Sequence, residues 1–350
     1  MVDGKFGFGL VGAGLVSAFH GDAINAAEEA QLVSCVDLNK ERLEKFCSEK
    51  GCEAAESFEA MLADKRIDIV NVLTPNAYHA QFAVPAMQAG KHVIVEKPPE
   101  MTLEKVDQMI GARDENNVKC AISLQVRFRK PIEAIKAAIE GGRFGRLLQG
   151  DAYMKWFRAT DYYLMDDWRS KRSEGAGVTI QHAFHYIDLL HHLMGEADSV
   201  RSQMYNLAHP EVELEDTVLG FIDYQNGAKG VVQGSTALWP GTDIRLEING
   251  ENGTAIMQGE RIVVWQFRDE QPEDEEIRSL GSEAVKTAAG GAADFAYFEH
   301  MYMVEDMIDA IKNDRSPRVS LESARGSLEL ALAMYESADN DSKLVQLPLG

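Results

Sequence analysis

The first third of the chain alternates two periods of hydrophobic residues. Short apolar runs typical of buried strands are separated by stretches in which apolar residues recur every three or four positions, as on one face of a helix. The predicted strands are Phe6–Val11, Leu32–Val36, Ile67–Leu73, His92–Val95 and Val118–Leu124. The predicted helices between them include Lys40–Glu49, Ala77–Ala89 and Leu103–Arg113. This alternation predicts a doubly wound parallel sheet with helices on both faces.

The hydrophobic pattern changes after about Leu124. One helix, Pro131–Glu140, leads into longer stretches in which apolar and polar residues alternate, the period of a half-buried strand. These predicted strands include Leu148–Phe157, Val218–Tyr224, Gly230–Thr236, Ile244–Ile248 and Arg261–Phe267. The Asn-Gly pairs of "YQNGAKG" and "INGENG" are typical of tight hairpins. This part of the chain therefore predicts an α+β domain with a large, mostly antiparallel open sheet.

Helical patterns cover much of the remainder. We predict one helix over Val178–Met194 and two amphipathic helices, Phe295–Lys312 and Leu321–Ser337, at the end of the chain. The stretch "RDEQPEDEE" is interpreted as a solvated loop, because like charges repel and nothing apolar anchors it. At 350 residues the chain is too long for one ordinary core. We therefore predict two domains, 1–124 and 125–350, with the last helices able to pack back on the first domain.

Composition and charge narrow the class of protein. Hydrophobic residues at 45% and charged residues at 26% are typical of a soluble globular protein. The net charge of -21 argues against nucleic acid or an anionic membrane as a partner. We find no signal peptide and no apolar stretch as long as a membrane span, so a cytoplasmic location is expected. The four cysteines form no CxxC pair, which predicts reduced thiols: Cys35, Cys47, Cys52 and Cys120.

A glycine-rich turn follows the first predicted strand. In Gly12-Ala13-Gly14-Leu15-Val16-Ser17, Gly12 allows a tight turn and Gly14 lets the backbone approach a pyrophosphate at a helix N-terminus. Ser17 takes the place of a third glycine and is small enough for helix–strand packing. Asp37 ends the next strand, where its carboxylate is expected to bind the adenosine ribose hydroxyls and to repel a 2′-phosphate. The sequence therefore predicts a dinucleotide site for NAD rather than NADP.

A charged turn ends the fourth predicted strand. "VIVEKPPE" places Glu96, Lys97 and Pro98 at a carboxyl end, where open α/β sheets hold their chemistry. Side chains of successive residues point to opposite sides of an extended chain, so Lys97 is able to face a cleft while Glu96 turns away. A dehydrogenase needs a donor that polarises the substrate oxygen, and Lys97 is placed for that role. The alternative is a surface lysine at a strand end.

Histidines gather in "GAGVTIQHAFHYIDLLHHLMG". Gln181 and His185 are four residues apart, so they are predicted to share one face of a helix, and Asp188 is three further along it. His185 is suited to the role of general base, because histidine changes protonation near neutral pH. No HExxH motif is present, and we therefore predict no metal site. His191 and His192 are interpreted as structural or solvent-facing.

At these motifs the sequence resembles the Gfo/Idh/MocA family, the glucose–fructose oxidoreductase and inositol dehydrogenase group. The resemblance covers nearly the whole chain and includes "GLVGAGLVSAFH", "NVLTPNAYHA", "AGKHVIVEKP" and "GAGVTIQHAFHYIDLL". It implies an N-terminal Rossmann domain. It also implies that Lys97 contacts the substrate hydroxyl and the nicotinamide ribose, that a cis peptide bond precedes Pro98, and that His185 is the acid/base. Where family members often carry an aspartate, this chain has Gln181, which is able to bind a hydroxyl but not to take its proton.

The resemblance also implies which residues bind the cofactor and the substrate. The residues expected to border the cofactor are Gly12, Gly14, Leu15, Val16, Asp37, Thr74, Pro75, Asn76, His79, Glu96, Lys97 and Gln125. Gln125 is expected to bind the nicotinamide carboxamide or the substrate. The substrate candidates are Gln181, Asp188, Tyr163, Trp168 and Arg169. An aromatic loop such as "ATDYYLMDDWRS" serves packing as often as recognition, and both readings of Tyr163, Trp168 and Arg169 remain open.

These residues predict an NAD-dependent dehydrogenase acting on a CH–OH group of a sugar, cyclic polyol or sugar derivative. Two alternatives remain: an NAD-dependent glycoside hydrolase that oxidises its sugar transiently, and a non-enzymatic nucleotide-binding sensor. The predicted partner is a small molecule, with neither nucleic acid nor membrane. A homodimer or homotetramer is expected to form through the antiparallel sheet, whose exposed face needs cover.

Overall fold

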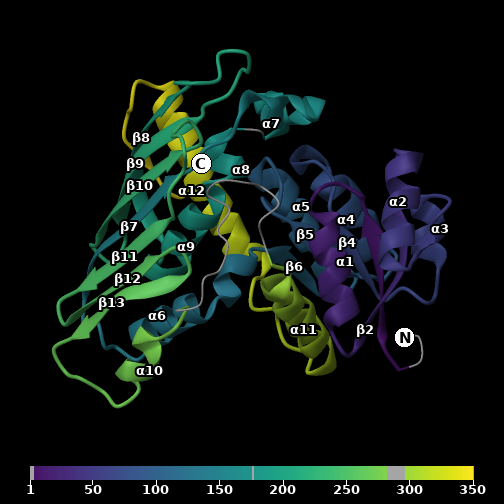
Figure 1. Ribbon diagram of the computed structural model, residues 1–350, viewed down its shortest axis with the longest axis horizontal. Helices are drawn as coiled ribbons and strands as arrows, with labels where there is room; N and C mark the ends of the chain where they lie inside the picture. Colours follow the sequence, from purple (N-terminus) through teal and green to yellow (C-terminus); the bar gives the residue numbers. More distant parts are fainter. Residues whose placement is uncertain (1–3, 176, 282–295, 350) are drawn as a thin grey trace. The chain divides into compact units, whose positions relative to one another are not determined.

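The structure is a computed structural model that describes residues 4–175, 177–281 and 296–349. It divides the chain into two compact units (Figure 1). The first unit consists of Met1–Gln125 and Ala296–Arg325, and the second of Val126–Phe295 and Gly326–Gly350. None of the helices in the described part of the chain combines the length and apolar character that a membrane crossing requires.

The first unit is built on a six-stranded parallel sheet with the strand order β3-β2-β1-β4-β5-β6. Its strands are β1 (Phe6–Val11), β2 (Ala30–Val36), β3 (Glu53–Ala54), β4 (Ile69–Val72), β5 (His92–Glu96) and β6 (Cys120–Ser123). The helices are α1 (Ser17–Ala26), α2 (Lys40–Lys50), α3 (Phe58–Ala63), α4 (His79–Gln88), α5 (Leu103–Glu115) and α11 (Phe298–Lys312). This is the predicted Rossmann sheet, and its strand order reverses direction between β1 and β4, where such sheets bind their ligands.

The second unit contains an eight-stranded sheet with the order β13-β12-β11-β7-β10-β9-β8-β14. Its strands are β7 (Leu147–Lys155), β8 (Ala197–Tyr205), β9 (Thr217–Tyr224), β10 (Lys229–Ser235), β11 (Arg245–Gly250), β12 (Gly253–Gln258), β13 (Arg261–Phe267) and β14 (Val345–Gln346). Only the β7–β10 pair is parallel among these strands. The prediction of a large, mostly antiparallel sheet is therefore confirmed, together with hairpins β9–β10 and β11–β12 at the two Asn-Gly turns.

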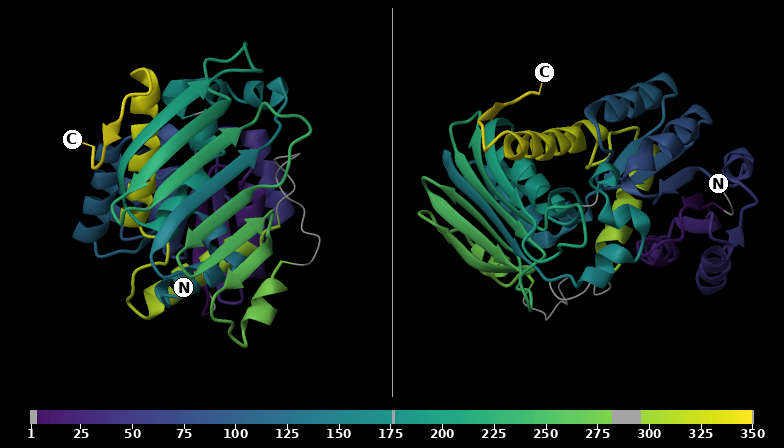
Figure 2. Two further views of the ribbon diagram at one scale, coloured as in Figure 1. Left: turned by 90° about the vertical axis from the view of Figure 1, so that its left-hand side faces the viewer. Right: turned by 90° about the horizontal axis from the view of Figure 1, so that it is seen from above.

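Helices cover one face of this sheet. They include α6 (Lys130–Glu140), α9 (Phe184–Met194) and the later part of α12 (Leu321–Asp339). The left view of Figure 2 looks onto the opposite face. That face carries exposed apolar side chains, among them Phe221 at 67% and Val263 at 45% exposure. Association of copies through this face remains a prediction.

The predicted helix Val178–Met194 is not continuous. It is divided into α8 (Val178–Gln181) and α9, because the backbone N–H groups of His182 and Ala183 both donate to the carbonyl of Val178. The bond from Ala183 spans five residues instead of four, so this turn contains one residue more than a regular α-helical turn. The spacing argument that placed Gln181 and His185 on one face of a regular helix was therefore wrong. Ala176, in the glycine-rich turn before α8, lies outside the described residues.

The interpretation of "RDEQPEDEE" as an unanchored loop was also wrong. The short helix α10 (Asp274–Arg278) begins inside it, and the Asp274 side chain is fully buried. Asp274 accepts hydrogen bonds from Arg143 Nη1 (2.6 Å) and from the Trp265 indole nitrogen (2.7 Å). A distant cation and an aromatic N–H therefore anchor this acidic segment, and neither is visible in its local charge pattern.

The ends of the chain agree closely with expectation. The predicted helix start at Phe295 lies outside the described residues, and α11 begins at Phe298 and packs against α1.

The four cysteines are free thiols, as predicted. Strand β8 was not predicted, because its polar positions alternate with few strongly apolar ones.

Candidate active site

The glycine-rich turn lies between β1 and α1. Gly12 has a φ of +106°, and a Cβ atom added there would lie 2.8 Å from the Leu73 carbonyl oxygen. Both facts require glycine at this position. At Gly14 the nearest atom to an added Cβ is 3.9 Å away, which leaves the backbone open to a ligand. Ser17 donates its hydroxyl to the Gly14 carbonyl (2.6 Å), so serine closes the turn where a third glycine is usual.

Asp37 follows β2 and is fixed beside this turn. Its carboxylate accepts hydrogen bonds from the backbone N–H groups of Ala13 (2.7 Å) and Asn39 (2.7 Å). Leu15 is 39% exposed, and the carbonyl of Val16 accepts bonds in the first turn of α1. The structure thus brings all the residues of the predicted pyrophosphate turn together with the predicted ribose acid.

Three side-chain oxygens near the carboxyl ends of β4 and β6 lack a hydrogen-bond partner in the described part of the chain. The buried oxygens Thr74 Oγ1, Ser123 Oγ and Gln125 Oε1 make no hydrogen bond. Leaving such a group unpaired costs about 1–3 kcal/mol, so polar groups in this state indicate a ligand. Together with the open backbone at Gly14, they fit a dinucleotide cofactor. Ser123 was missed in the sequence, where a lone serine at a strand end gives no signal.

The loop after β4 packs against the turn that follows β5. His79 Nδ1 lies 2.8 Å from the Pro98 carbonyl oxygen, and Nε2 lies 3.0 Å from that of Thr74. Burial lowers the pKa of His79. Pro75 precedes the short 3-10 helix Asn76–Tyr78, in which Asn76 is buried. His79 therefore links the two loops that are predicted to border the cofactor.

Glu96 and Lys97 differ in burial at the end of β5, where Lys97 is partly exposed. Glu96 is buried, and its Oε1 accepts a hydrogen bond from His20 Nε2 (2.9 Å), while Oε2 accepts one from the Lys97 backbone N–H (3.1 Å). Burial opposes ionisation, but the bond from His20 and nearby cations hold the pKa of Glu96 well below its usual range. The Lys97–Pro98 peptide is cis, as the resemblance implied.

His20, Glu96 and His300 form a buried cluster whose ligand-type atoms lie within 4.8 Å of one another. Both ring nitrogens of His20 already have partners, since the Asn71 amide nitrogen lies 3.0 Å from Nδ1. Glu96 therefore links His20 to the backbone N–H of Lys97. Its histidines are 280 positions apart in the chain, and only the packing of α11 on α1 brings them together.

In the second unit, the predicted acid/base His185 and the predicted substrate-binding residue Gln181 flank the break between α8 and α9. Gln181 ends α8 and His185 lies in the first turn of α9. Glu215 supports the start of α8: its carboxylate accepts hydrogen bonds from Thr179 N (3.0 Å) and from the Tyr335 hydroxyl (2.6 Å). A Cβ at Gly177 would lie 2.1 Å from that carboxylate, which explains the glycine.

Asp188 lies inside the second unit and not at its surface. It is fully buried, and its oxygens accept bonds from Arg127 Nε (2.8 Å) and the Ser327 hydroxyl (2.7 Å). Asp188 and Arg127 form an ion pair inside the unit. This position favours a structural role, and substrate binding by Asp188 remains only a prediction.

The aromatic loop is held by contacts within it and by a hydrogen bond to Thr236. The Tyr163 hydroxyl lies 2.6 Å from Thr236 Oγ1, and the ring is 1% exposed. Arg169 bonds the Tyr162 hydroxyl (2.9 Å) and lies 4.5 Å from the Trp168 ring. Packing therefore accounts for Tyr163 and Arg169, while Trp168 is only partly buried.

Sequence reasoning missed Trp156 and Arg158, which follow β7. The Arg158 guanidinium lies 5.1 Å from the Trp156 ring and 5.8 Å from the Tyr162 ring. His182, three residues before His185, is 6.3 Å from the Trp156 ring and 5.4 Å from that of Tyr162. Burial lowers the pKa of Arg158. A buried cation within an aromatic cluster thus lies next to the helix that carries His185.

This fold and the dinucleotide turn define an NAD-binding oxidoreductase. Residues 6–124 match a family described as "Oxidoreductase family, NAD-binding Rossmann fold", and residues 132–256 match the "GFO/IDH/MocA C-terminal domain". The chain therefore belongs to the Gfo/Idh/MocA family.

Similar proteins differ in substrate. The WlbA dehydrogenase from Bordetella pertussis, solved in complex with NADH and UDP-GlcNAcA, is 32% identical over the whole of both chains, with a TM-score of 0.91. Myo-inositol 2-dehydrogenase from Thermotoga maritima is 24% identical, covering 95% of this chain and 96% of the relative. Levoglucosan dehydrogenase from Pseudarthrobacter phenanthrenivorans is 29% identical over 58% of each chain.

Proposed function

We propose that this enzyme is an NAD-dependent dehydrogenase that oxidises a hydroxyl group of a nucleotide-linked sugar acid. The coarser assignment, a dehydrogenase of sugars or polyols, agrees with the family and with all three relatives named above. The sugar-acid assignment is carried by Arg158, a cation that is 5% exposed beside the helix of His185. The similarity to the WlbA dehydrogenase supports the same class of substrate.

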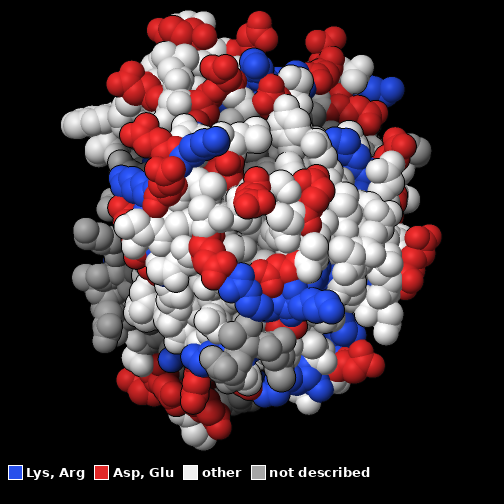
Figure 3. All heavy atoms as spheres, turned by 90° about the vertical axis from the view of Figure 1, so that its right-hand side faces the viewer, with Lys and Arg blue, Asp and Glu red and all other residues white. Residues whose placement is uncertain are grey.

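An anionic substrate needs a cation in its binding site, because the protein as a whole is negatively charged. The chain carries a net charge of -21, and in Figure 3 acidic side chains spread over the face shown, with Lys and Arg among them. A substrate with a carboxylate and a diphosphate is repelled by this overall charge. Screening limits the repulsion to about 8 Å at physiological salt, so groups in direct contact decide the affinity. A buried guanidinium binds a carboxylate strongly and in a defined orientation.

The roles of the chemical groups follow from their types. When bound, NAD accepts the hydride that leaves the hydroxyl-bearing carbon. Lys97 donates a hydrogen bond to the hydroxyl oxygen and stabilises the negative charge that develops there. His185 takes the hydroxyl proton, because the amide of Gln181 is unable to do so. Asp37 binds the adenosine ribose and disfavours NADP, while Thr74 and Gln125 bind the nicotinamide half.

The test is NADH absorbance with purified protein, NAD and a panel of four compounds: UDP-GlcNAcA, its neutral counterpart UDP-GlcNAc, myo-inositol and levoglucosan. We expect turnover of UDP-GlcNAcA and a kcat/KM at least about 100-fold lower for UDP-GlcNAc, because a site built for a charged group rejects the analogue without it. Faster oxidation of myo-inositol or levoglucosan would overturn the sugar-acid assignment and leave the dehydrogenase assignment intact.

Two variants separate chemistry from recognition. Lys97→Met is expected to lower kcat by about 10²–10⁴-fold while NAD binding, followed by titration, is retained. Arg158→Gln is expected to lower kcat/KM for UDP-GlcNAcA only. If Lys97→Met oxidises the substrate at the wild-type rate, the proposed chemistry is wrong. Cleavage without accumulating NADH would instead indicate the hydrolase, and NAD binding without any turnover would indicate the sensor.

A further inference from the structure

The short helix α8 depends on a residue from outside it. It contains four residues, far fewer than an isolated helix needs in water, and its N-cap residue, Gly177, has no side chain that could cap it. Glu215, 36 positions after Thr179, supplies two acceptors instead. Its backbone carbonyl accepts a hydrogen bond from Val178 N (2.9 Å), and its carboxylate Oε1 accepts one from Thr179 N (3.0 Å). One residue thus holds two consecutive N–H groups at the start of α8.

Helix α12 contributes a second donor to the same carboxylate oxygen. The hydroxyl of Tyr335, 120 positions away, donates to Glu215 Oε1 (2.6 Å). The Tyr335 ring lies 4.9 Å from the Arg172 guanidinium, which bonds the Asp339 carboxylate (2.6 Å). Glu215 is 8% exposed, so these protein donors take the place of water. Burial raises the pKa of Glu215, but Oε1 accepts both bonds whether or not the other oxygen carries a proton.

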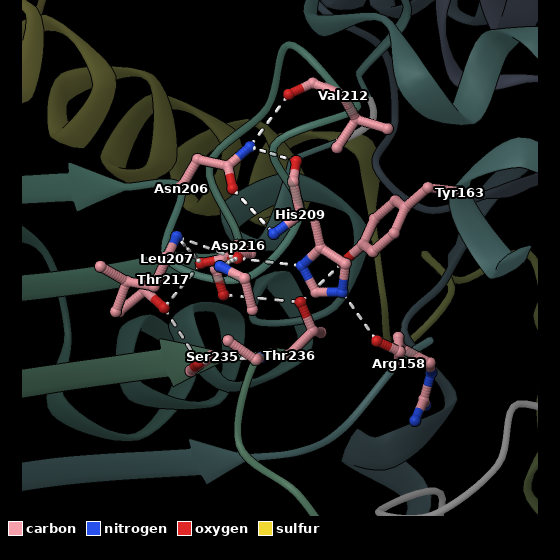
Figure 4. Close-up of polar contacts among 12 residues, drawn as sticks. Arg158, Tyr163, Asn206, Leu207, His209, Val212, Asp216, Thr217, Ser235 and Thr236 are labelled. Carbon is pink, nitrogen blue, oxygen red and sulfur yellow. Dashed lines mark hydrogen bonds and ion pairs between the residues drawn. The ribbon is translucent and has the colours of Figure 1, made fainter. Parts of the chain in front are cut away.

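The backbone at Glu215 is held by the buried Asp216 that follows it. The Asp216 carboxylate accepts a hydrogen bond from the Leu207 backbone N–H (3.0 Å), and its Oδ2 lies 2.9 Å from His209 Nδ1. His209 Nε2 lies 2.7 Å from the Arg158 carbonyl oxygen, so the same ring also joins the segment after β7. Figure 4 shows these contacts converging on Asp216 and His209. The connection between β8 and β9 therefore gives Glu215 a fixed base.

Val178 connects this support to the break before α9. Its N–H is the one that the Glu215 carbonyl accepts, and its own carbonyl accepts the bonds from His182 N (3.0 Å) and Ala183 N (2.7 Å) that produce the irregular turn. This turn decides where α9 begins, and His185 lies in the first turn of α9. A short path of backbone hydrogen bonds therefore leads from Glu215 to the helix turn that carries His185.

Gly177 is adapted to the same carboxylate. Its φ of -72° and ψ of 163° are open to any residue, so the backbone conformation does not require glycine. The space does, because an added Cβ would lie 2.1 Å from Glu215 Oε2. The glycine keeps room for the carboxylate, and a methyl group at this position would displace it.

We propose that Glu215 is a positioning residue for the oxidation step: by holding the start of α8 it fixes the irregular turn, and through it the place of His185. This inference rests on the proposed function, in which His185 takes the hydroxyl proton. A displacement of a reacting group by about 1 Å can cost about 100-fold in rate. Loss of the Glu215 support is therefore expected to lower the rate of oxidation and to leave the cofactor turn of the first unit intact.

The place of His185 is tested first, without any substrate. In protein labelled with ¹³C-histidine, the ring signal of His185 is assigned by its absence from His185→Asn, and His79 of the first unit serves as internal reference. We expect Glu215→Ala and Gly177→Ala to shift the His185 signal. Glu215→Gln, whose amide oxygen accepts the same two bonds, leaves it close to the wild-type position. An unmoved His185 signal in both alanine variants overturns the proposal, whatever the enzyme oxidises.

The effect on oxidation is measured with whichever panel compound the enzyme oxidises fastest, so that a wrong sugar-acid assignment does not affect the result. We expect Glu215→Ala to lower kcat about 10–100-fold, with NAD affinity changed less than about twofold. Glu215→Gln retains most of the activity, and Tyr335→Phe, which removes one of the two donors, falls between them. An unchanged kcat in Glu215→Ala, or an equal loss in Glu215→Gln, overturns the positioning role. If the enzyme oxidises no compound, the proposed function fails, while the histidine signals still decide the place of His185.

A double-mutant cycle separates this support from a general loss of stability. Gly177→Ala alone is expected to lower kcat about tenfold, because the added methyl group displaces the carboxylate. In the Glu215→Ala background the space is free, and the same change is expected to alter kcat less than about twofold. Glu213→Ala, an exposed change in the same connection, is the matched control and leaves all parameters unchanged. If Gly177→Ala lowers kcat by the same factor with and without the carboxylate, the positioning role is wrong.

Discussion

In the first unit, three buried side-chain oxygens at the carboxyl ends of β4 and β6 have no hydrogen-bond partner among the described residues, those of Thr74, Ser123 and Gln125. In the second unit, by contrast, buried polar side chains form pairs with each other, as in Arg127–Asp188 and His209–Asp216. The first unit also contains a buried pair, His20–Glu96, but these three oxygens remain open, which fits the proposed cofactor site. The second unit uses buried pairs to hold together its own segments, among them the segment of Arg158 that we propose to bind the substrate.

The largest effect is expected where a buried pair is broken. Asp188→Ala leaves the Arg127 guanidinium buried without its carboxylate, which is expected to lower the free energy of unfolding by about 3–5 kcal/mol. Denaturant titration measures this. Arg146→Ala is the control, because the exposed Arg146–Glu251 pair contributes at most about 1 kcal/mol. Wild-type stability with a raised sugar KM in Asp188→Ala would instead assign Asp188 to the substrate site.

A smaller effect is expected at the cofactor turn. Gly12→Ala forces a side chain into a left-handed backbone conformation, at a cost of about 1–2 kcal/mol, and brings its Cβ against the Leu73 carbonyl. We expect NAD affinity to fall about tenfold or more by fluorescence titration. Gly111→Ala in α5, where an added Cβ meets nothing within 4 Å, is the matched control. Unchanged NAD affinity in Gly12→Ala would show that the nucleotide does not use this turn.

The smallest effect concerns the choice of nucleotide. Asp37→Ser removes the charge that disfavours a 2′-phosphate, and the ratio of kcat/KM for NADP to that for NAD is expected to rise about tenfold. Steady-state kinetics with both nucleotides measure this ratio. Glu41→Gln, which removes an exposed charge in the first turn of α2, is expected to leave it unchanged. If kcat/KM falls equally with NAD and NADP, Asp37 does not discriminate between the nucleotides and only holds the turn, through its hydrogen bond from the Ala13 N–H.

Much of the first unit follows from local sequence. The strand Phe6–Val11, the glycine turn and Asp37 are predictable because a parallel βαβ unit places each of them within a few residues of a recognisable pattern. In the second unit, hydrophobic periodicity predicted the sheet and its hairpins. The same reasoning failed at Ala183, because periodicity reports the average helical spacing and does not detect one inserted residue.

The sequence by itself determined the class of protein: the sheet types, the dinucleotide turn and the residues Lys97 and His185 as candidates. Only the tertiary structure decided which charges are paired, because Asp188 meets Arg127 across 61 positions and Asp274 meets Arg143 across 131. A carboxylate looks the same in sequence whether it binds a substrate or a buried arginine. Its role depends on the partner that folding brings within hydrogen-bonding distance, and burial makes that partner indispensable.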